Sequence, residues 1–302
     1  MVAAVAYALN NVLSGIAVHN RGMDYVVAVT LRALPTLVLA FIIGQRHRKT
    51  ACTPLLADWR LALAYVGYGL LTFTVAGPLQ FAALQEGGVV VASPITGTQV
   101  LWGAIIAAIF LKERFGRKMA AGMVVSILGI TLLSLGKAGA VQLSPTWWLA
   151  IPYATGTALC WSLSAVLITY TMRRGVDRFQ ALAAGVLVGL TCSNAYLALS
   201  GHMGAYASTP IDQVVAVSVG GLFGAVALLS ITSAMAFTSV ASANAINTLQ
   251  VGIAPLVSWL LVPGESMSAA TAVGIALIMV GVIAVQRARL AGEQGPAEPE
   301  PA

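Results

Sequence analysis

Long apolar stretches, separated by short polar segments, follow one another along almost the whole chain. A helix that crosses a bilayer needs about 20 mostly apolar residues. Stretches of this kind can be read between charges and turn residues at 2–18, 25–44, 60–84, 88–110, 118–136, 147–171, 179–199, 213–236, 241–262 and 268–286. The sequence therefore predicts an all-α membrane protein with ten transmembrane helices.

The composition excludes the main soluble classes. Of the 302 residues, 59% are hydrophobic and only 9% are charged, whereas about a quarter of an ordinary soluble domain is charged. So few charges could not cover the surface of a soluble enzyme, a nucleic-acid-binding protein or a disordered chain. The net charge of +6 comes from short basic clusters between apolar stretches, which is typical of membrane topology. We expect the lipid bilayer, and no nucleic acid, as a partner.

Neither a cofactor nor enzyme chemistry is expected. The three cysteines and three histidines have no spacing typical of a disulfide framework or a metal site. No phosphate-binding loop and no nucleophile or zinc motif is present. An intramembrane enzyme would also need paired carboxylates, or a histidine with serine or cysteine, at depth in the membrane, and the sequence lacks such a set.

Basic residues predict the orientation, because cytoplasmic loops are enriched in lysine and arginine. If the N-terminus is inside, most of the 16 basic residues lie in inner loops and the tail: Arg46, Arg48, Lys49, Arg60, Lys112, Arg114, Arg117, Lys118, Arg173, Arg174, Arg178, Arg287 and Arg289. The outer loops hold only Arg21 and Lys137, and Arg32 lies inside the second stretch. We therefore expect a multi-pass protein of the inner (plasma) membrane with both termini cytoplasmic.

The two halves of the chain repeat. At an offset of 152 residues, Glu113, Ala120, Gly122 and Gly129 fall on Glu265, Ala272, Gly274 and Gly281. Each half holds five stretches, so the second half must enter the membrane upside down, as in the inverted repeats of many secondary transporters. The glycines of each half share one helix face, which predicts close helix packing. Each glutamate stands before a helix start, where a capping role is expected.

The segments "FLKERFGRKMAAGMVVSILGITLLS" and "LLVPGESMSAATAVGIALIMVGVIAV", together with the two five-helix halves, resemble the EamA-like branch of the drug/metabolite transporter superfamily. The resemblance covers essentially the whole chain. It implies a ten-helix carrier of two inverted repeats that exports amino acids, drugs or other metabolites. The tryptophan usual in the first helix of the family is absent here, and Trp161 of the sixth stretch occupies the comparable position, offset onto Ala8.

These observations divide the chain into three parts. Residues 1–140 form the first EamA-like repeat, 141–288 form the second, and 289–302 form a disordered cytoplasmic tail rich in proline, glycine and glutamate. Projecting the sixth stretch back by 153 residues starts the first stretch before residue 1, so we expect a short lead to precede it.

Polar residues inside the apolar stretches are the candidates for a substrate cavity. The offset of 152 residues places Gln250 on Thr98, next to Gln99. Such counterparts lie across the central axis of inverted repeats. Amides offer both donors and acceptors, and an indole offers a flat wall with one donor. The candidate cavity residues are Gln99, Trp102, Asn247, Gln250, Asn11, Trp161 and Arg32. Hydrogen bonding between helices, or snorkelling for Arg32, is the alternative role.

The function that follows is a secondary transporter, expected to export a small polar metabolite such as an amino acid by alternating access. Efflux of hydrophobic or cationic drugs is one alternative. A non-transporting membrane receptor or assembly protein is another, although long loops or a soluble domain, usual in that class, are missing. The expected partner is a small-molecule substrate, with a second copy of the chain, as a homodimer, a further candidate.

The predicted orientation can be checked with reporter fusions. A reporter placed after Gly139 should read outside, and one placed after Gly175 should read inside, because basic residues hold the loop after the sixth stretch in the cytoplasm. The reverse reading at both points would overturn the orientation.

Overall fold

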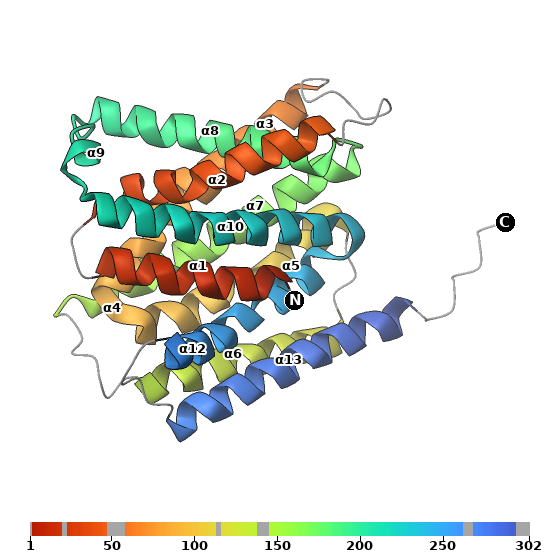
Figure 1. Cartoon of the computed structure of the whole chain (residues 1–302). Coiled ribbons are helices and arrows are strands. Elements are labelled where there is room, and N and C mark those ends of the chain that lie inside the picture. The colour runs from red at the N-terminus through yellow and green to blue at the C-terminus, as the bar shows by residue number, and fades with distance from the viewer. Residues whose placement is uncertain are drawn as a thin grey trace.

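The computed structural model describes residues 2–19, 23–46, 58–112, 116–137, 145–261 and 268–293, and these residues form helices and turns without any strand (Figure 1). The elements are α1 (Val2–His19), α2 (Tyr25–Arg46), α3 (Trp59–Gly69), the π-helix η1 (Leu70–Ala76), α4 (Gly77–Gly97), α5 (Gln99–Leu111), α6 (Arg117–Lys137), the 3₁₀ turn η3 (Trp147–Leu149), α7 (Ala150–Arg173), α8 (Arg178–Leu199), α9 (Ala205–Ser208), α10 (Ile211–Phe237), α11 (Val240–Asn247), α12 (Leu249–Leu261) and α13 (Ala269–Glu293).

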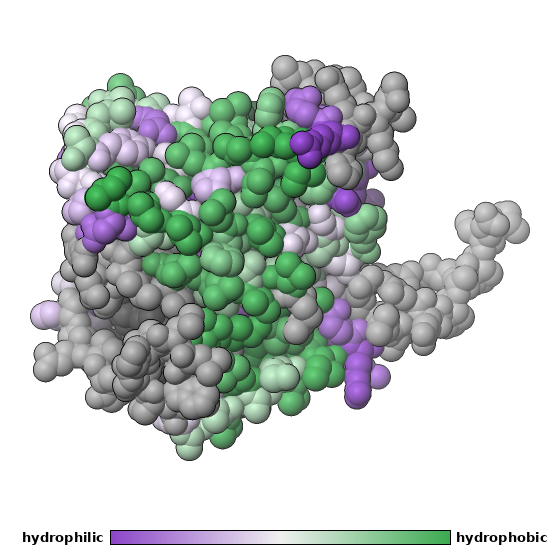
Figure 2. All heavy atoms as spheres, viewed as in Figure 1, coloured by the Kyte–Doolittle hydropathy of each residue, from purple (hydrophilic) through white to green (hydrophobic). Residues whose placement is uncertain are grey.

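Seven helices in the described part are long and apolar enough to cross a membrane: Tyr25–Arg46, Trp59–Ala83, Arg117–Leu135, Trp147–Arg173, Arg178–Leu199, Ile211–Phe237 and Ala269–Ala288. A shorter apolar helix runs over Ile95–Leu111. Figure 2 shows apolar residues covering the middle of one face and hydrophilic residues gathered toward its edges. The all-α, multi-span prediction is confirmed, while the count of ten spans stays a prediction.

The boundary between the predicted spans 60–84 and 88–110 falls inside α4, whose residues keep helical structure through this region. The chain reverses within α4, as the hydrogen bond from Thr96 Oγ1 to Gln80 Oε1 at 3.1 Å shows. In a straight helix these residues would lie about 24 Å apart along the axis. The reversal agrees with two separate spans on either side of this boundary.

Helix α13 also extends beyond the expected limit. It continues to Glu293, past residue 288, where the sequence predicted the second repeat to end and a disordered tail to begin. Arg289, Leu290 and Ala291 are good helix formers, so the helix can continue until the glycine- and proline-rich segment. Residues 294–302 lie outside the described part, as do the predicted caps Glu113 and Glu265.

Helices α6 and α13 pack against each other through the glycines that the repeat predicted, at the lower edge of the bundle in Figure 1. A methyl group added at Gly122 would lie 2.9 Å from the carbonyl oxygen of Gly281, and one added at Gly129 would lie 2.8 Å from that of Gly274. These pairs run in opposite order along the two helices, so the helices are antiparallel and in backbone contact. The predicted packing role of the glycines is confirmed.

The remaining helices pair as a two-fold axis in the membrane plane would require. Helix α1 packs on α10 and α12, and α7, its counterpart in the second half, packs on α3, η1 and α5. Two pairs of counterparts, α2 with α8 and α6 with α13, pack directly on each other. These contacts support the inverted repeat inferred from the sequence.

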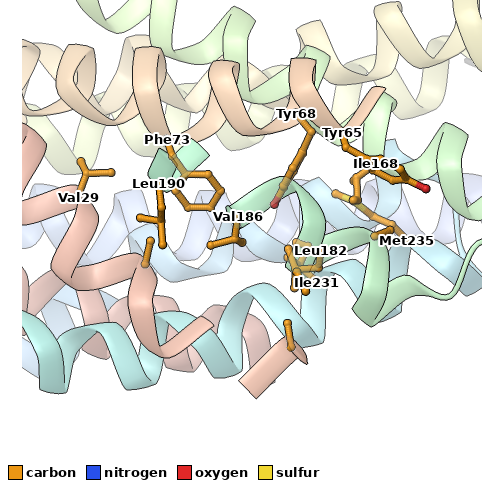
Figure 3. Close-up of a cluster of buried hydrophobic side chains, with 14 of the residues drawn as sticks. Val29, Tyr65, Tyr68, Phe73, Ile168, Leu182, Val186, Leu190, Ile231 and Met235 are labelled. Atoms are coloured by element: carbon orange, nitrogen blue, oxygen red, sulfur yellow. The ribbon is translucent and has the colours of Figure 1, made fainter. Parts of the chain in front are cut away.

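The largest buried apolar cluster joins α2, α3, η1, α8 and α10 (Figure 3). The rings of Tyr68 and Phe73 meet edge to face at 6.2 Å and lie beside Val186 and Leu190 of α8. Gly185 of α8 makes room for Tyr68, since an added methyl group would overlap that ring. The π-helix therefore sits on a tightly packed face, and Thr74 Oγ1 donates to the carbonyl of Gly189 at 3.3 Å.

Replacing Gly129 by alanine should destabilise the protein, because the added methyl group would lie 2.7 Å from the backbone nitrogen of Ile278. We expect a loss of about 1–3 kcal/mol, measured as a lower melting temperature of the purified protein. Gly204→Ala is the matched control, since no atom lies within 4 Å of that added methyl group. Equal melting temperatures for both variants would show that α6 and α13 do not depend on this contact.

Candidate functional site

Two of the predicted spans are not continuous helices. The fourth is interrupted at Thr98, between α4 and α5, and the ninth at Thr248, between α11 and α12. The Thr98 N–H donates to the carbonyl of Ile95 at 3.0 Å, and the Thr248 N–H donates to those of Asn244 and Ala245 at 3.0 and 3.2 Å. Both hydroxyls also bond back, Thr98 Oγ1 to Ile95 O at 2.6 Å and Thr248 Oγ1 to Asn244 O at 3.0 Å. The predicted spans 88–110 and 241–262 therefore each contain one tightened turn, at a threonine whose backbone angles stay right-handed helical: φ −64° and ψ −11° at Thr98, φ −58° and ψ −23° at Thr248.

The two breaks occupy places in the repeats that match within one residue. An offset of 151 residues superposes Ile95 on Ile246 and the pair Gln99-Val100 on Gln250-Val251, and it places Thr98 on Leu249, next to Thr248. This shift differs by one residue from the offset of the glycine helices, and it makes Gln99 and Gln250 direct counterparts. Gln99 is the first residue of α5 and Gln250 the second residue of α12.

A polar junction forms where α5 meets α7 and α11, and we use that name for Gln99, Gly103, Ser162 and Asn244. Ser162 Oγ of α7 donates to the carbonyl of Gln99 at 2.9 Å and to that of Ala158 at 2.7 Å. A methyl group added at Gly103 would lie 2.8 Å from Nδ2 of Asn244 and 3.8 Å from Oγ of Ser162. The absent side chain at Gly103 thus lets the amide of Asn244 reach α5.

Asn247 lies one residue before the second break. Its side chain is buried, with 8% of its surface exposed, and among the described residues its Oδ1 has no hydrogen-bond partner. An unpaired amide oxygen in such surroundings costs about 1–3 kcal/mol. A solute or water that donates a hydrogen bond to this oxygen would remove that cost.

The other predicted residues are distributed around this region. Trp161 is half-buried on α7, next to Ser162 of the polar junction. Gln250 is half-buried on α12, which packs on α1. Asn11 belongs to α1, but its side chain lies outside the described part; its neighbour Asn10 is buried and lies against Gly224 of α10.

Trp102 lies away from the polar junction. It is 38% exposed and falls in a line with Ile105 and Ile109, which are exposed as well. The opposite side of α5 carries the buried residues Val100, Ala104 and Ala107. The structure therefore brings the backbone carbonyl of Gln99, but not the ring of Trp102, to the contact of α5 with α7 and α11.

Arg32 belongs to a second group of side chains in α2 and α4. Its guanidinium carbon lies 5.4 Å from the ring centre of Phe81, and the same ring stacks on Tyr25 at 5.8 Å. Helix α2 packs on α4, α8, α10 and η1, so the arginine is not part of the polar junction.

Sequence reasoning did not place Ser162 and Asn244 in the candidate site. It did not single out Gly103. A glycine in an apolar stretch has no distinguishing pattern, and only its position opposite Asn244 shows what it does. The offset of 151 residues was the available signal for the pairing of Gln99 with Gln250.

The sequence matches the model of the EamA-like transporter family over residues 1–135 and again over 148–286. The chain belongs to the EamA-like transporter family. It is thus a multi-pass membrane protein of a transporter family, with one family unit in each half. No curated protein matches this EamA-like chain.

The crystal structure of another protein has the same fold as this EamA-like chain. It superposes with a TM-score of 0.71 at 17% sequence identity, and the match covers 97% of this chain and 99% of the other. The likeness extends over both halves, and at this identity it concerns the fold alone.

The accessibility of the polar junction can be measured with single cysteines. In a background without Cys52, Cys160 and Cys192, a Gln99→Cys thiol should react with a small methanethiosulfonate reagent, because Gln99 is only half-buried. Val100→Cys is the matched control on the next residue, which is 1% exposed, and it should react at least about tenfold more slowly. Equal labelling rates would contradict this placement of Gln99.

Proposed function

We propose that this EamA-like protein is a secondary transporter that exports a small polar metabolite, such as an amino acid, by alternating access. The proposal includes a location in the inner (plasma) membrane with both termini in the cytoplasm. Membership of a transporter family and the distribution of basic residues support it.

The observation that carries the proposal is the pair of helix breaks at Thr98 and Thr248. In secondary transporters, interrupted helices near the interface of inverted repeats commonly form the substrate site. Irregular backbone is tolerated at membrane depth only when it is buried in protein or lines a water-filled cavity. Here each break is followed by a glutamine, and the unpaired oxygen of Asn247 stands beside one of them.

The side chains near the breaks suit a polar ligand without a net charge. Gln99, Asn247 and Gln250 each offer amide donors and an acceptor, and the half-buried Trp161 of α7 is an aromatic candidate. Among the described residues, His, Cys, Asp and Glu form no group of three or more that could hold a metal ion. Substrate binding would therefore depend on hydrogen bonds, with Asn11, Trp102 and Arg32 as further candidate contacts.

Alternating access requires a part that holds its shape and a part that changes. The close contact of α6 with α13 suits the first role, because glycines bring the two backbones together and leave little room for the helices to move. The breaks suit the second, since a few residues at the ends of elements can absorb a change in backbone angles.

The proposal can be tested by counterflow of a mixture of the 20 common amino acids into proteoliposomes. Gln99→Ala and Gln250→Ala should each lower flux about tenfold or more, because the loss of one ligand hydrogen bond in a dry site is worth about 1–3 kcal/mol. Their melting temperatures should stay close to that of the unmodified protein. Gln180→Ala, an amide variant at the inner end of α8, is the matched control and should transport normally.

Two results would count against this assignment. Normal flux in both glutamine variants would show that the substrate does not bind at the helix breaks. A loss of flux that follows the loss of folded protein would show that the amides only hold helices together, at roughly 0.6 kcal/mol each.

A further inference from the structure

Arg32 is a charged residue in the interior of a predicted membrane span. It lies seven residues into α2, or roughly 10 Å along the axis from Tyr25, in the outer half of the span in the predicted orientation. Its guanidinium lies over the buried ring of Phe81 from α4, and Tyr7 of α1 is within electrostatic range. The contact with Phe81 of α4 directs the side chain toward the protein rather than toward lipid.

Within the described residues, Arg32 has neither an ion pair nor a hydrogen bond from its guanidinium. Asp24 of the same segment is used elsewhere, since its Oδ1 accepts from the N–H groups of Val26 and Val27 at 2.8 and 3.1 Å. Glu86 of α4 accepts a hydrogen bond from Thr146, in the loop before α7. Both carboxylates near the outer ends of these helices therefore have other partners.

A guanidinium without a counterion is costly inside a membrane protein, whichever estimate of the cost is used. The ring of Phe81 compensates only in part, by roughly 0.5–2 kcal/mol. The ring contacts the guanidinium over one face and cannot accept its in-plane N–H groups, which form a fork suited to a carboxylate. Arg32 is half-buried, so part of its side chain is not covered by other residues of the protein.

We propose that Arg32 binds a carboxylate of the transported solute, and this inference rests on the transport function proposed above. The structure assigns a carboxylate rather than a phosphate, because a phosphate carries about two negative charges and Arg32 is the only lysine or arginine inside the described spans away from their ends. The transported class is thus one of small solutes that carry a carboxylate, and a zwitterionic amino acid also has the zero net charge that the neutral amides at the breaks suit. The stack of Tyr25 on Phe81 holds the ring that positions the guanidinium.

The test compares acids with their amides on the purified full-length protein. The probes are the common amino acids, their carboxamides, and acetate, butyrate and inorganic phosphate, each measured by thermal stabilisation and by counterflow in proteoliposomes. At least one carboxylate should bind. Its amide should bind at least about tenfold more weakly, as expected for the loss of a charge-assisted bidentate contact.

Variants of Arg32 carry the second half of the test. Arg32→Gln should remove the preference for acid over amide, and Arg32→Lys should keep part of it, because lysine retains the charge but not the fork. Arg60→Gln is the matched control, since Arg60 also lies over an aromatic ring, that of Trp59 at 5.6 Å, at the start of α3. It should bind and transport like the unmodified protein.

Several outcomes would overturn the inference. They are equal binding of an acid and its amide, an unchanged preference in Arg32→Gln, preferential binding of phosphate, or no binding of any carboxylate. If Arg32→Gln does not fold, the comparison of acid with amide on the unmodified protein and on Arg32→Lys still decides. Arg32-independent flux of amides would leave the transport function standing and reject only the carboxylate site.

Discussion

In the apolar core of a bilayer, each backbone N–H and C=O group needs a partner within the protein. This constraint explains why the described chain is helical even where it reverses direction, within α4 between Gln80 and Thr96. It also limits how far the interruptions at Thr98 and Thr248 can depart from a helix. The Thr98 N–H bonds to the carbonyl of Ile95, three residues back, and the Thr248 N–H keeps its bond to the carbonyl of Asn244, four residues back. The protein thus has two tightened turns, at places that match within one residue between its halves.

The glycine contacts solve the complementary problem of holding helices together where lipid is as apolar as the side chains. Gly122 and Gly129 of α6 meet Gly281 and Gly274 of α13 backbone to backbone. Because this pair joins counterparts from the two halves, it places the symmetry axis of the repeat between them. The same device recurs at Gly185 of α8, where a large ring enters the space. The most closely packed contacts are therefore separate from the polar junction.

Several of these features could be predicted from the sequence because they are local. Apolar length predicts spans, and the spacing of Gly122 and Gly129 predicts a smooth helix face; both agree with the structure. The places of the breaks could not be predicted, since a threonine such as Thr248 is equally compatible with a regular helix. Nor could the side of α5 that faces its neighbours, so the exposure of Trp102 could not be foreseen from the sequence.

The contact between Arg32 and Phe81 joins residues far apart in sequence, so periodicity alone could not reveal it. Its position suggests how a carrier could bind a solute without holding it too strongly. Passage requires binding that is favourable enough for entry and weak enough for release. One guanidinium next to an apolar ring, with neutral amides at the helix breaks, would give the solute a single charged contact. Several cations would bind an anion more tightly, and a carrier must change state with its solute and then let it go.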